Sequence, residues 1–157
     1  MKVPFFGSKR EHKFLKKKLL YHLSRVIEHG KSLQGPEVLL LEKKISKFIQ
    51  KKYAVAVSSC TDALYFSIKA LGIGEGDEVL VTSYSFIASA SSILRSGAKP
   101  IFIDVNNNGN MDIKNIETKI TKKTKAILYV HLYGYMENIK KVSNLAKKNK
   151  IFLIEDF

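Results

Sequence analysis

The sequence predicts an α/β fold with a mostly parallel sheet and alternating helices, preceded by two N-terminal helices. Two observations support this fold class. After residue 52, short apolar segments of strand length alternate with segments of helical periodicity. These apolar segments also lack polar alternation, which is typical of parallel strands that are covered on both faces. Before residue 53, apolar residues recur at helical spacing instead.

Residues 1–52 are predicted to be a helical segment. A first helix is expected over 11–28, where leucines recur along one stripe, and Gly30 ends it. A second helix follows Pro36, because a first helical turn tolerates proline. Its apolar residues continue at i+3 and i+4 spacing to Ile49.

Residues 53–157 are predicted to be the α/β part. Five strands are expected, at 53–57, 78–82, 99–105, 125–132 and 151–156. Between them we expect helices at 61–71, 85–96, 112–120 and 136–149. The chain ends on a strand, where an α/β domain normally places a ligand-binding loop. We therefore expect residues 1–157 to form a single, incomplete domain.

Composition indicates a globular, cytoplasmic protein. Hydrophobic residues make up 45% and charged residues 26% of the 157 residues. No apolar run approaches the roughly 20 residues of a membrane span, and no apolar signal-peptide region follows the basic N-terminus. A single cysteine, Cys60, excludes an internal disulfide and suits a reducing compartment.

The net charge of +13 does not indicate a nucleic-acid partner. It comes from 24 lysines and three arginines, and arginine is the residue whose planar fork reads bases and phosphates. The lysines are scattered over every expected helix and loop, without a nucleic-acid-binding motif. We interpret them as a solvated surface with weak attraction to anionic ligands.

The carboxyl ends of parallel strands gather ligands, and polar residues follow several of them. At residues 58–62 a turn rich in hydroxyls precedes a helix, so its amides and the hydroxyls of Ser59 or Thr61 suit a phosphate. Capping of the helix by the same hydroxyls is the alternative, and it is favoured when the turn is taken alone.

Other sequence motifs give weaker indications of function. The glycines of 72–77 follow a helix and precede a strand, the reverse of a dinucleotide loop. Cys60 and His131 suggest a nucleophile and a base, but no third group orients them. The remaining histidines lack metal-ligand spacing, so no metal site is predicted; they are His12, His22 and His29.

Six ordered segments resemble the DegT/DnrJ/EryC1/StrS family. They are QGPEV with a following Glu (34–42), VSSCTDAL (57–64), LGIGEGDEVLVTSYSFIASA (71–90), GAKPIFIDV (97–105), TKAILYVHLYG (124–134) and IED (154–156). The resemblance implies an aminotransferase of nucleotide-linked keto-sugars that depends on pyridoxal 5'-phosphate (PLP) and has the aspartate-aminotransferase fold (fold type I). It implies an amino donor, usually glutamate, a homodimer and a role in amino-sugar and polysaccharide biosynthesis.

The resemblance also assigns cofactor contacts. Asp156 matches the aspartate that pairs with the pyridinium nitrogen, and Phe86 the aromatic residue stacked on the ring. Thr61 and Asp62 fall in the phosphate segment S-G-T, where Cys60 replaces the glycine and requires a backbone outside the left-handed region. His131 and Gly134 are placed near the cofactor without a role. The predicted cofactor-binding set is Ser59, Cys60, Thr61, Asp62, Phe86 and Asp156.

No catalytic residue is predicted in this chain. In the family the lysine that forms the Schiff base with PLP lies in a later S-F…K segment, and none of the 24 lysines here stands in such a context. We therefore expect a truncated N-terminal fragment that is inactive alone, from a truncated or split gene or a partial sequence. The family's sheet places later strands beside 53–57, so we expect an unpaired edge there and an unstable or aggregation-prone chain.

Two alternatives remain open at this point. The chain is a non-catalytic module that binds phosphate ligands or a partner protein, or it is a relative that uses PLP to dehydrate a sugar.

Overall fold

A computed structural model describes residues 7–157, which divide into two compact units, one up to Ala56 and one from Val57 to Phe157. The division lies four residues from the predicted boundary at 52. That both units form one domain stays a prediction. The prediction that the N-terminus has no signal peptide falls partly on residues 1–6, which lie outside the described residues.

The first unit contains the two predicted helices, α1 (Ser8–His29) and α2 (Pro36–Phe48). Gly30 ends α1 in the left-handed conformation, with φ 67°. The His29 imidazole Nε2 lies 3.1 Å from Glu37 Oε2, which joins the end of α1 to the start of α2. Neither helix contains a buried residue. No helix among residues 7–157 is long and apolar enough to cross a membrane.

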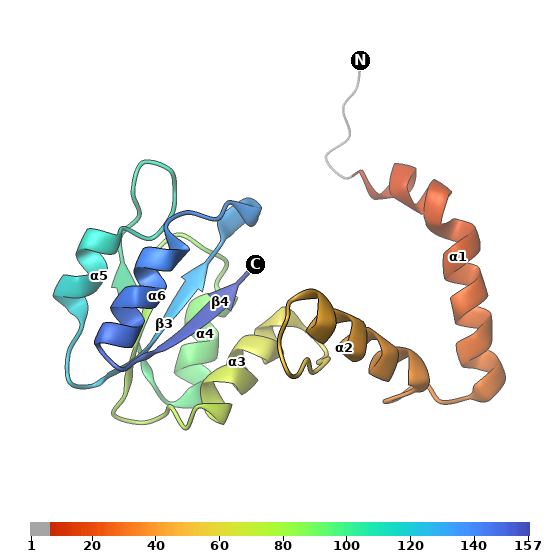
Figure 1. The fold of residues 1–157 in the computed structure, drawn as a ribbon, viewed down its shortest axis with the longest axis horizontal. Coiled ribbons are helices and arrows are strands. Elements are labelled where there is room, and N and C mark those ends of the chain that lie inside the picture. Colours follow the sequence, from red (N-terminus) through yellow and green to blue (C-terminus); the bar gives the residue numbers. More distant parts are fainter. Residues whose placement is uncertain (1–6) are drawn as a thin grey trace, which may run out of the picture. The chain divides into compact units, whose positions relative to one another are not determined.

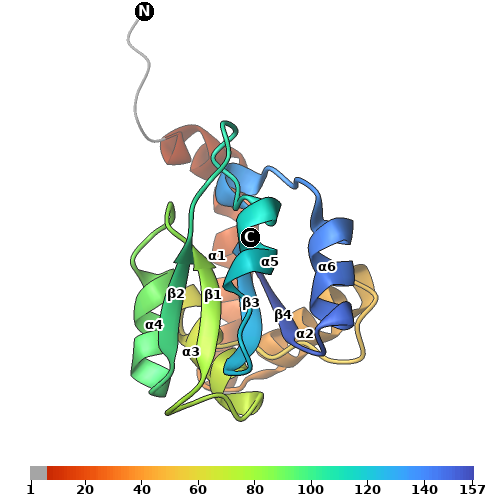
Figure 2. The same cartoon turned by 90° about the vertical axis from the view of Figure 1, so that its left-hand side faces the viewer.

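The second unit is built on a parallel sheet of four strands (Figure 1), and Figure 2 shows their order, β2-β1-β3-β4. The strands are β1 (Glu78–Thr82), β2 (Lys99–Ile103), β3 (Thr124–Val130) and β4 (Phe152–Asp156). Four helices accompany them: α3 (Cys60–Ala70), α4 (Ala88–Ser96), α5 (Ile113–Lys119) and α6 (Ile139–Lys148). This arrangement confirms the predicted fold class.

Each face of the sheet has its own apolar core. Ala126 and Leu128 of β3 pack with residues of α3 and α4, whereas Ile127 and Tyr129 pack with residues of α5 and α6. Successive strand residues point to opposite faces, so both faces need apolar residues. This explains why the strands lack polar alternation.

The predicted strand at 53–57 is wrong. Residues 53–57 form no β-ladder in the described part of the chain, and the side chains of Tyr53 and Val55 are 72% and 78% exposed. A strand needs a hydrogen-bonded neighbour, and an apolar sequence pattern does not supply one. The sheet edges are β2 and β4 instead.

Candidate functional site

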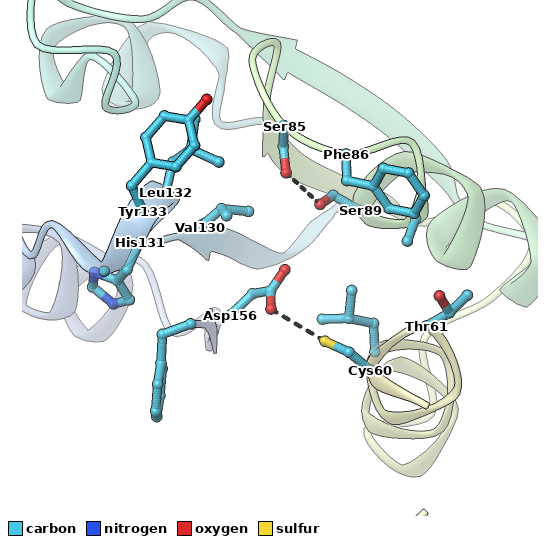
Figure 3. Close-up of a pocket in the computed structure, with 14 residues that line it drawn as sticks. Cys60, Thr61, Ser85, Phe86, Ser89, Val130, His131, Leu132, Tyr133 and Asp156 are labelled. Carbon is cyan, nitrogen blue, oxygen red and sulfur yellow. Dashed lines mark hydrogen bonds between the residues drawn. The ribbon is translucent and has the colours of Figure 1, made fainter. Parts of the chain in front are cut away.

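A pocket of about 480 Å³ opens in the second unit at the carboxyl ends of β3 and β4. Four of the six predicted site residues line it, from three separate parts of the chain (Figure 3): Cys60, Thr61, Phe86 and Asp156. Ser59 and Asp62 are not among the residues that line it. The structure thus brings together the strand ends and the turn that the sequence singled out.

Asp156 and Cys60 are in direct contact in this pocket. The Cys60 thiol donates a hydrogen bond to Asp156 Oδ1, with Sγ and Oδ1 3.3 Å apart (Figure 3). Partial burial raises the pKa of the Cys60 thiol, and the hydrogen bond and charge of Asp156 raise it further. A raised pKa keeps the thiol protonated, which disfavours a nucleophilic role.

His131 is not a base for Cys60. Its ring is 1% exposed and bonds through Nε2 to Glu155 Oε2 at 3.0 Å. Figure 3 shows the ring turned away from Cys60 and Asp156. His131 and Gly134 both line the pocket, and the His131 imidazole packs beside Tyr129, with ring centroids 5.1 Å apart.

The turn before α3 uses the Ser59 hydroxyl to cap the helix. Ser59 is the N-cap residue, and its Oγ accepts a hydrogen bond from the Asp62 amide at 3.1 Å. The same hydroxyl donates to Asp62 Oδ2 at 3.2 Å. In this structure the Ser59 hydroxyl therefore caps α3, and its contact with a phosphate stays a prediction.

The amides that remain for an anion are those of Cys60 and Thr61. They belong to the first two residues of α3, so no preceding helical carbonyl accepts from them. Both residues line the pocket. The helix dipole favours negative charge at this end, so this end of α3 suits a phosphate.

Asp62 lies beside the turn, where its carboxylate accepts several hydrogen bonds. Its carboxylate accepts from Ser58 Oγ at 2.6 Å and from the Arg95 guanidinium at 2.9 Å. Hydrogen bonds from Ser58, Arg95 and Ser59 hold the pKa of Asp62 below its ordinary value of 3.8. A carboxylate in this state repels a phosphate, so a direct contact between the Asp62 side chain and phosphate is not supported.

Phe86 lies in the turn before α4 and not inside a helix as predicted, since α4 begins at Ala88. Its side chain is 74% exposed and lines the pocket, on the wall above Thr61 and Cys60 (Figure 3). Sequence reasoning without the family would place this residue in the core. Its exposure leaves a ring face free for stacking.

Tyr133 lines the pocket but is not in the predicted cofactor-binding set. It has a left-handed backbone with φ 58° and is 89% exposed. A hydrogen bond with the Tyr84 phenol raises the pKa of Tyr133. The signal for it was its place in the segment 131–134, directly after a strand end.

Comparison with known proteins identifies the family. The model of the DegT/DnrJ/EryC1/StrS aminotransferase family matches residues 14–157. The chain belongs to this family. Family members depend on PLP, so PLP is the cofactor to consider at the pocket.

Two similar proteins show how much of a relative's length the chain covers. It is 35% identical over 157 residues to a pleiotropic regulatory protein of Geobacillus stearothermophilus, covering 99% of this chain and 42% of that protein. It is 36% identical over 155 residues to the UDP-2-acetamido-2-deoxy-3-oxo-D-glucuronate aminotransferase of Pseudomonas aeruginosa, covering 98% and 43%. The chain spans less than half the length of both relatives.

The solved structure of NtdA from Bacillus subtilis with the cofactor PMP is also similar. The TM-score is 0.93 and the identity 38%, covering 99% of this chain and 36% of that chain. This likeness confirms that the chain has the fold of a PLP-dependent aminotransferase.

The residues of the pocket fit PLP in part. A carboxylate at Asp156 suits a protonated ring nitrogen, and the amides of Cys60 and Thr61 suit a phosphate. No lysine is among the described residues that line the pocket. Within residues 7–157, no group of three or more His, Cys, Asp or Glu residues is arranged to hold a metal ion.

Proposed function

We propose that the chain is part of a PLP-dependent aminotransferase of nucleotide-linked keto-sugars. The observation that carries this is one pocket lined both by Asp156 and by the free amides at the start of α3. The Pseudomonas relative, an aminotransferase of a UDP-linked oxo-sugar, supports the substrate class. Glutamate as amino donor and a homodimeric enzyme are part of the same proposal.

Asp156 keeps the ring nitrogen protonated. PLP, when bound, serves as an electron sink, and a protonated nitrogen makes the ring a better acceptor of electrons. The Asp156 carboxylate stabilises that proton by a charge-assisted hydrogen bond. Oδ1 already accepts from Cys60, so Oδ2 is the atom that we assign to the ring nitrogen.

The start of α3 and Phe86 hold the rest of the cofactor. The Cys60 and Thr61 amides and the Thr61 hydroxyl donate to the phosphate, and the helix dipole adds to the attraction. The exposed Phe86 ring covers one face of the pyridine and excludes water from it. Ser59 and Asp62 stabilise this turn through the hydrogen bonds between them, which include the helix cap.

Binding of pyridoxamine 5'-phosphate (PMP) to the chain tests the proposal, because PMP does not require a lysine. We expect Asp156→Asn to weaken PMP binding roughly tenfold, since a charge-assisted hydrogen bond becomes a neutral one. Asp104→Asn is the matched control, because exposed Asp104 follows β2 and does not line the pocket. Equal affinities of wild type, D156N and D104N would contradict the role of Asp156.

The lysine that anchors PLP is, in this proposal, not among the 157 residues, so this chain alone does not transaminate. Reduction with borohydride in the presence of PLP, followed by peptide mapping, tests this. We expect scattered, substoichiometric labelling of surface lysines. Stoichiometric labelling of one lysine would overturn the proposal. The nucleotide sequence after codon 157 is an independent check, because a continuation that encodes an S-F…K segment is expected.

A non-catalytic binding module is the second candidate. One observation favours it: the Geobacillus relative is named a regulatory protein. Such a module needs no ring-nitrogen partner, so it would bind inorganic phosphate and PMP with similar affinity. Its affinity for PMP would also be unchanged by Asp156→Asn.

The dehydratase alternative is not separated by this experiment. The lysine position that distinguishes such relatives is not among these residues, so an aminotransferase and a dehydratase predict the same PMP binding.

A further inference from the structure

We propose that Arg95 is a positioning residue for the phosphate turn, which it acts on through Asp62. This inference rests on the proposed function, since it concerns how the start of α3 receives the cofactor's phosphate. Neither side chain lines the pocket. Their effect is on the charge and shape of the turn next to it.

The geometry joins two helices at this turn. Arg95 lies near the end of α4 and Asp62 in the first turn of α3, and the guanidinium Nη1 is 2.9 Å from Asp62 Oδ1. The guanidinium also stacks on the Tyr65 ring, with Cζ 4.1 Å from the centroid. Arg95 is the single arginine of residues 57–157. Stacking on Tyr65 holds this cation in place beside Asp62.

Asp62 uses both carboxylate oxygens. Oδ1 accepts from Arg95, while Oδ2 accepts from the hydroxyls of Ser58 and Ser59 at 2.6 and 3.2 Å. Both hydroxyls are thereby turned toward Asp62. The phosphate donors left at the turn are the amides and the hydroxyl of Thr61, which makes the arrangement of the turn depend on Asp62.

The same network places a negative charge close to a phosphate site. A carboxylate in the first turn of α3 opposes binding of a second anion there, while the arginine cation compensates it. The Arg95 and Asp62 side chains are 55% and 27% exposed, and an isolated exposed ion pair contributes little to stability. We therefore assign the pair an electrostatic effect on phosphate affinity and not a large effect on folding.

The test compares PMP with pyridoxamine, which lacks the phosphate, by titration of the full 157-residue chain. Arg95→Ala leaves Asp62 uncompensated, so we expect PMP affinity to fall about fivefold and pyridoxamine affinity to change less than about twofold. The loss should shrink at 1 M salt, where a charge effect is screened. Arg25→Ala, at an exposed arginine of α1, is the matched control.

A double-mutant cycle separates charge from structure. Asp62→Asn removes the charge that Arg95 compensates, so Arg95→Ala in the Asp62→Asn background should change PMP affinity less than about twofold. Arg95→Lys keeps the charge and should retain PMP affinity within about twofold. Far-UV circular dichroism reports whether each variant folds. If Arg95→Ala does not fold, the PMP affinity of Arg95→Lys decides whether the inference holds.

The outcomes distinguish this inference from the proposed function. Equal loss of PMP and pyridoxamine binding in Arg95→Ala, or the same loss in the Asp62→Asn background, would overturn the positioning role. A PMP affinity of Arg95→Lys well below that of wild type would do so too. If wild type binds PMP but Arg95→Ala binds it equally well, only the inference fails. If wild type binds no PMP, the proposed function fails, and the inference fails with it.

Discussion

At the scale of single residues, Cys60 determines how Asp156 is presented to the pocket. The thiol donates to one carboxylate oxygen of Asp156 and leaves the other for a ligand. Cys60 stands where the family motif has glycine, but it is the first residue of α3 and has no positive φ. The residue is therefore accommodated without backbone strain, as a residue other than glycine requires at this position.

The hydrogen bond between Cys60 and Asp156 predicts how fast the Cys60 thiol is alkylated. Removal of the Asp156 charge should lower the pKa of the thiol, since that carboxylate is one cause of its raised pKa. Asp156→Asn should then speed alkylation by iodoacetamide at pH 8.5, because more thiolate is present. Cys60 is the single cysteine, so total labelling measured by mass spectrometry is a direct readout. The same rate in wild type and D156N, with D104N as control, would argue against the contact.

Residue types and their place at strand ends were enough to predict that Asp156 and the turn before α3 lie near one another, at one pocket. They were not enough for Asp62, which the S-G-T resemblance assigned to the phosphate. Its partner Arg95 is 33 residues away, on another helix, and no sequence pattern pairs the two. Phe86 was found by resemblance, although its exposure depends on where α4 begins.

At the scale of elements, the start of α3 depends on ionised Asp62. The pKa of Asp62 in the folded chain lies below 3.8, so its hydrogen bonds stabilise the fold fully above that pH. This stabilisation is lost as the pH falls through the lowered pKa. The stability difference between wild type and Asp62→Asn should therefore narrow below about pH 3.8. Urea midpoints from circular dichroism at pH 6 and pH 2.5 measure it, and an unchanged difference would contradict the network.

Strand prediction succeeded where neighbours exist and failed where they do not. β1, β3 and β4 were expected within two residues of their observed bounds because both faces of each are apolar. The segment 53–57 has the same apolar character, yet it forms no ladder in the described residues. Local pattern encodes burial, whereas pairing depends on strands elsewhere in the chain.

At the scale of the whole molecule, the two units differ in how they bury apolar residues. The second unit has a core on each face of its sheet. The described part of the first unit, residues 7–56, has none, and large apolar side chains of α1 and α2 are more than half exposed, including Phe14, Leu19, Ile27, Leu39 and Phe48. Exposed apolar surface of this extent favours association.

We therefore predict that the chain self-associates at tens of micromolar, or aggregates. Light scattering coupled to size-exclusion chromatography over a concentration series measures this. Substitution of Leu19 and Phe48 by Gln should reduce the association, since it removes apolar side chains from the first unit without touching the sheet. A chain that stays monomeric at every concentration and unfolds in one cooperative transition would contradict the prediction.

In the proposed function, one pocket of this chain receives both the phosphate and the ring nitrogen of PLP. Amide hydrogen exchange, followed by mass spectrometry with and without saturating PMP, tests it most directly. We expect PMP to slow amide exchange in peptides that cover residues 58–62, 84–90 and 154–157. Pyridoxamine, which lacks the phosphate, should slow exchange less in the peptide that covers 58–62. Protection confined to the lysine-rich helix α1, or no protection at all, would contradict it.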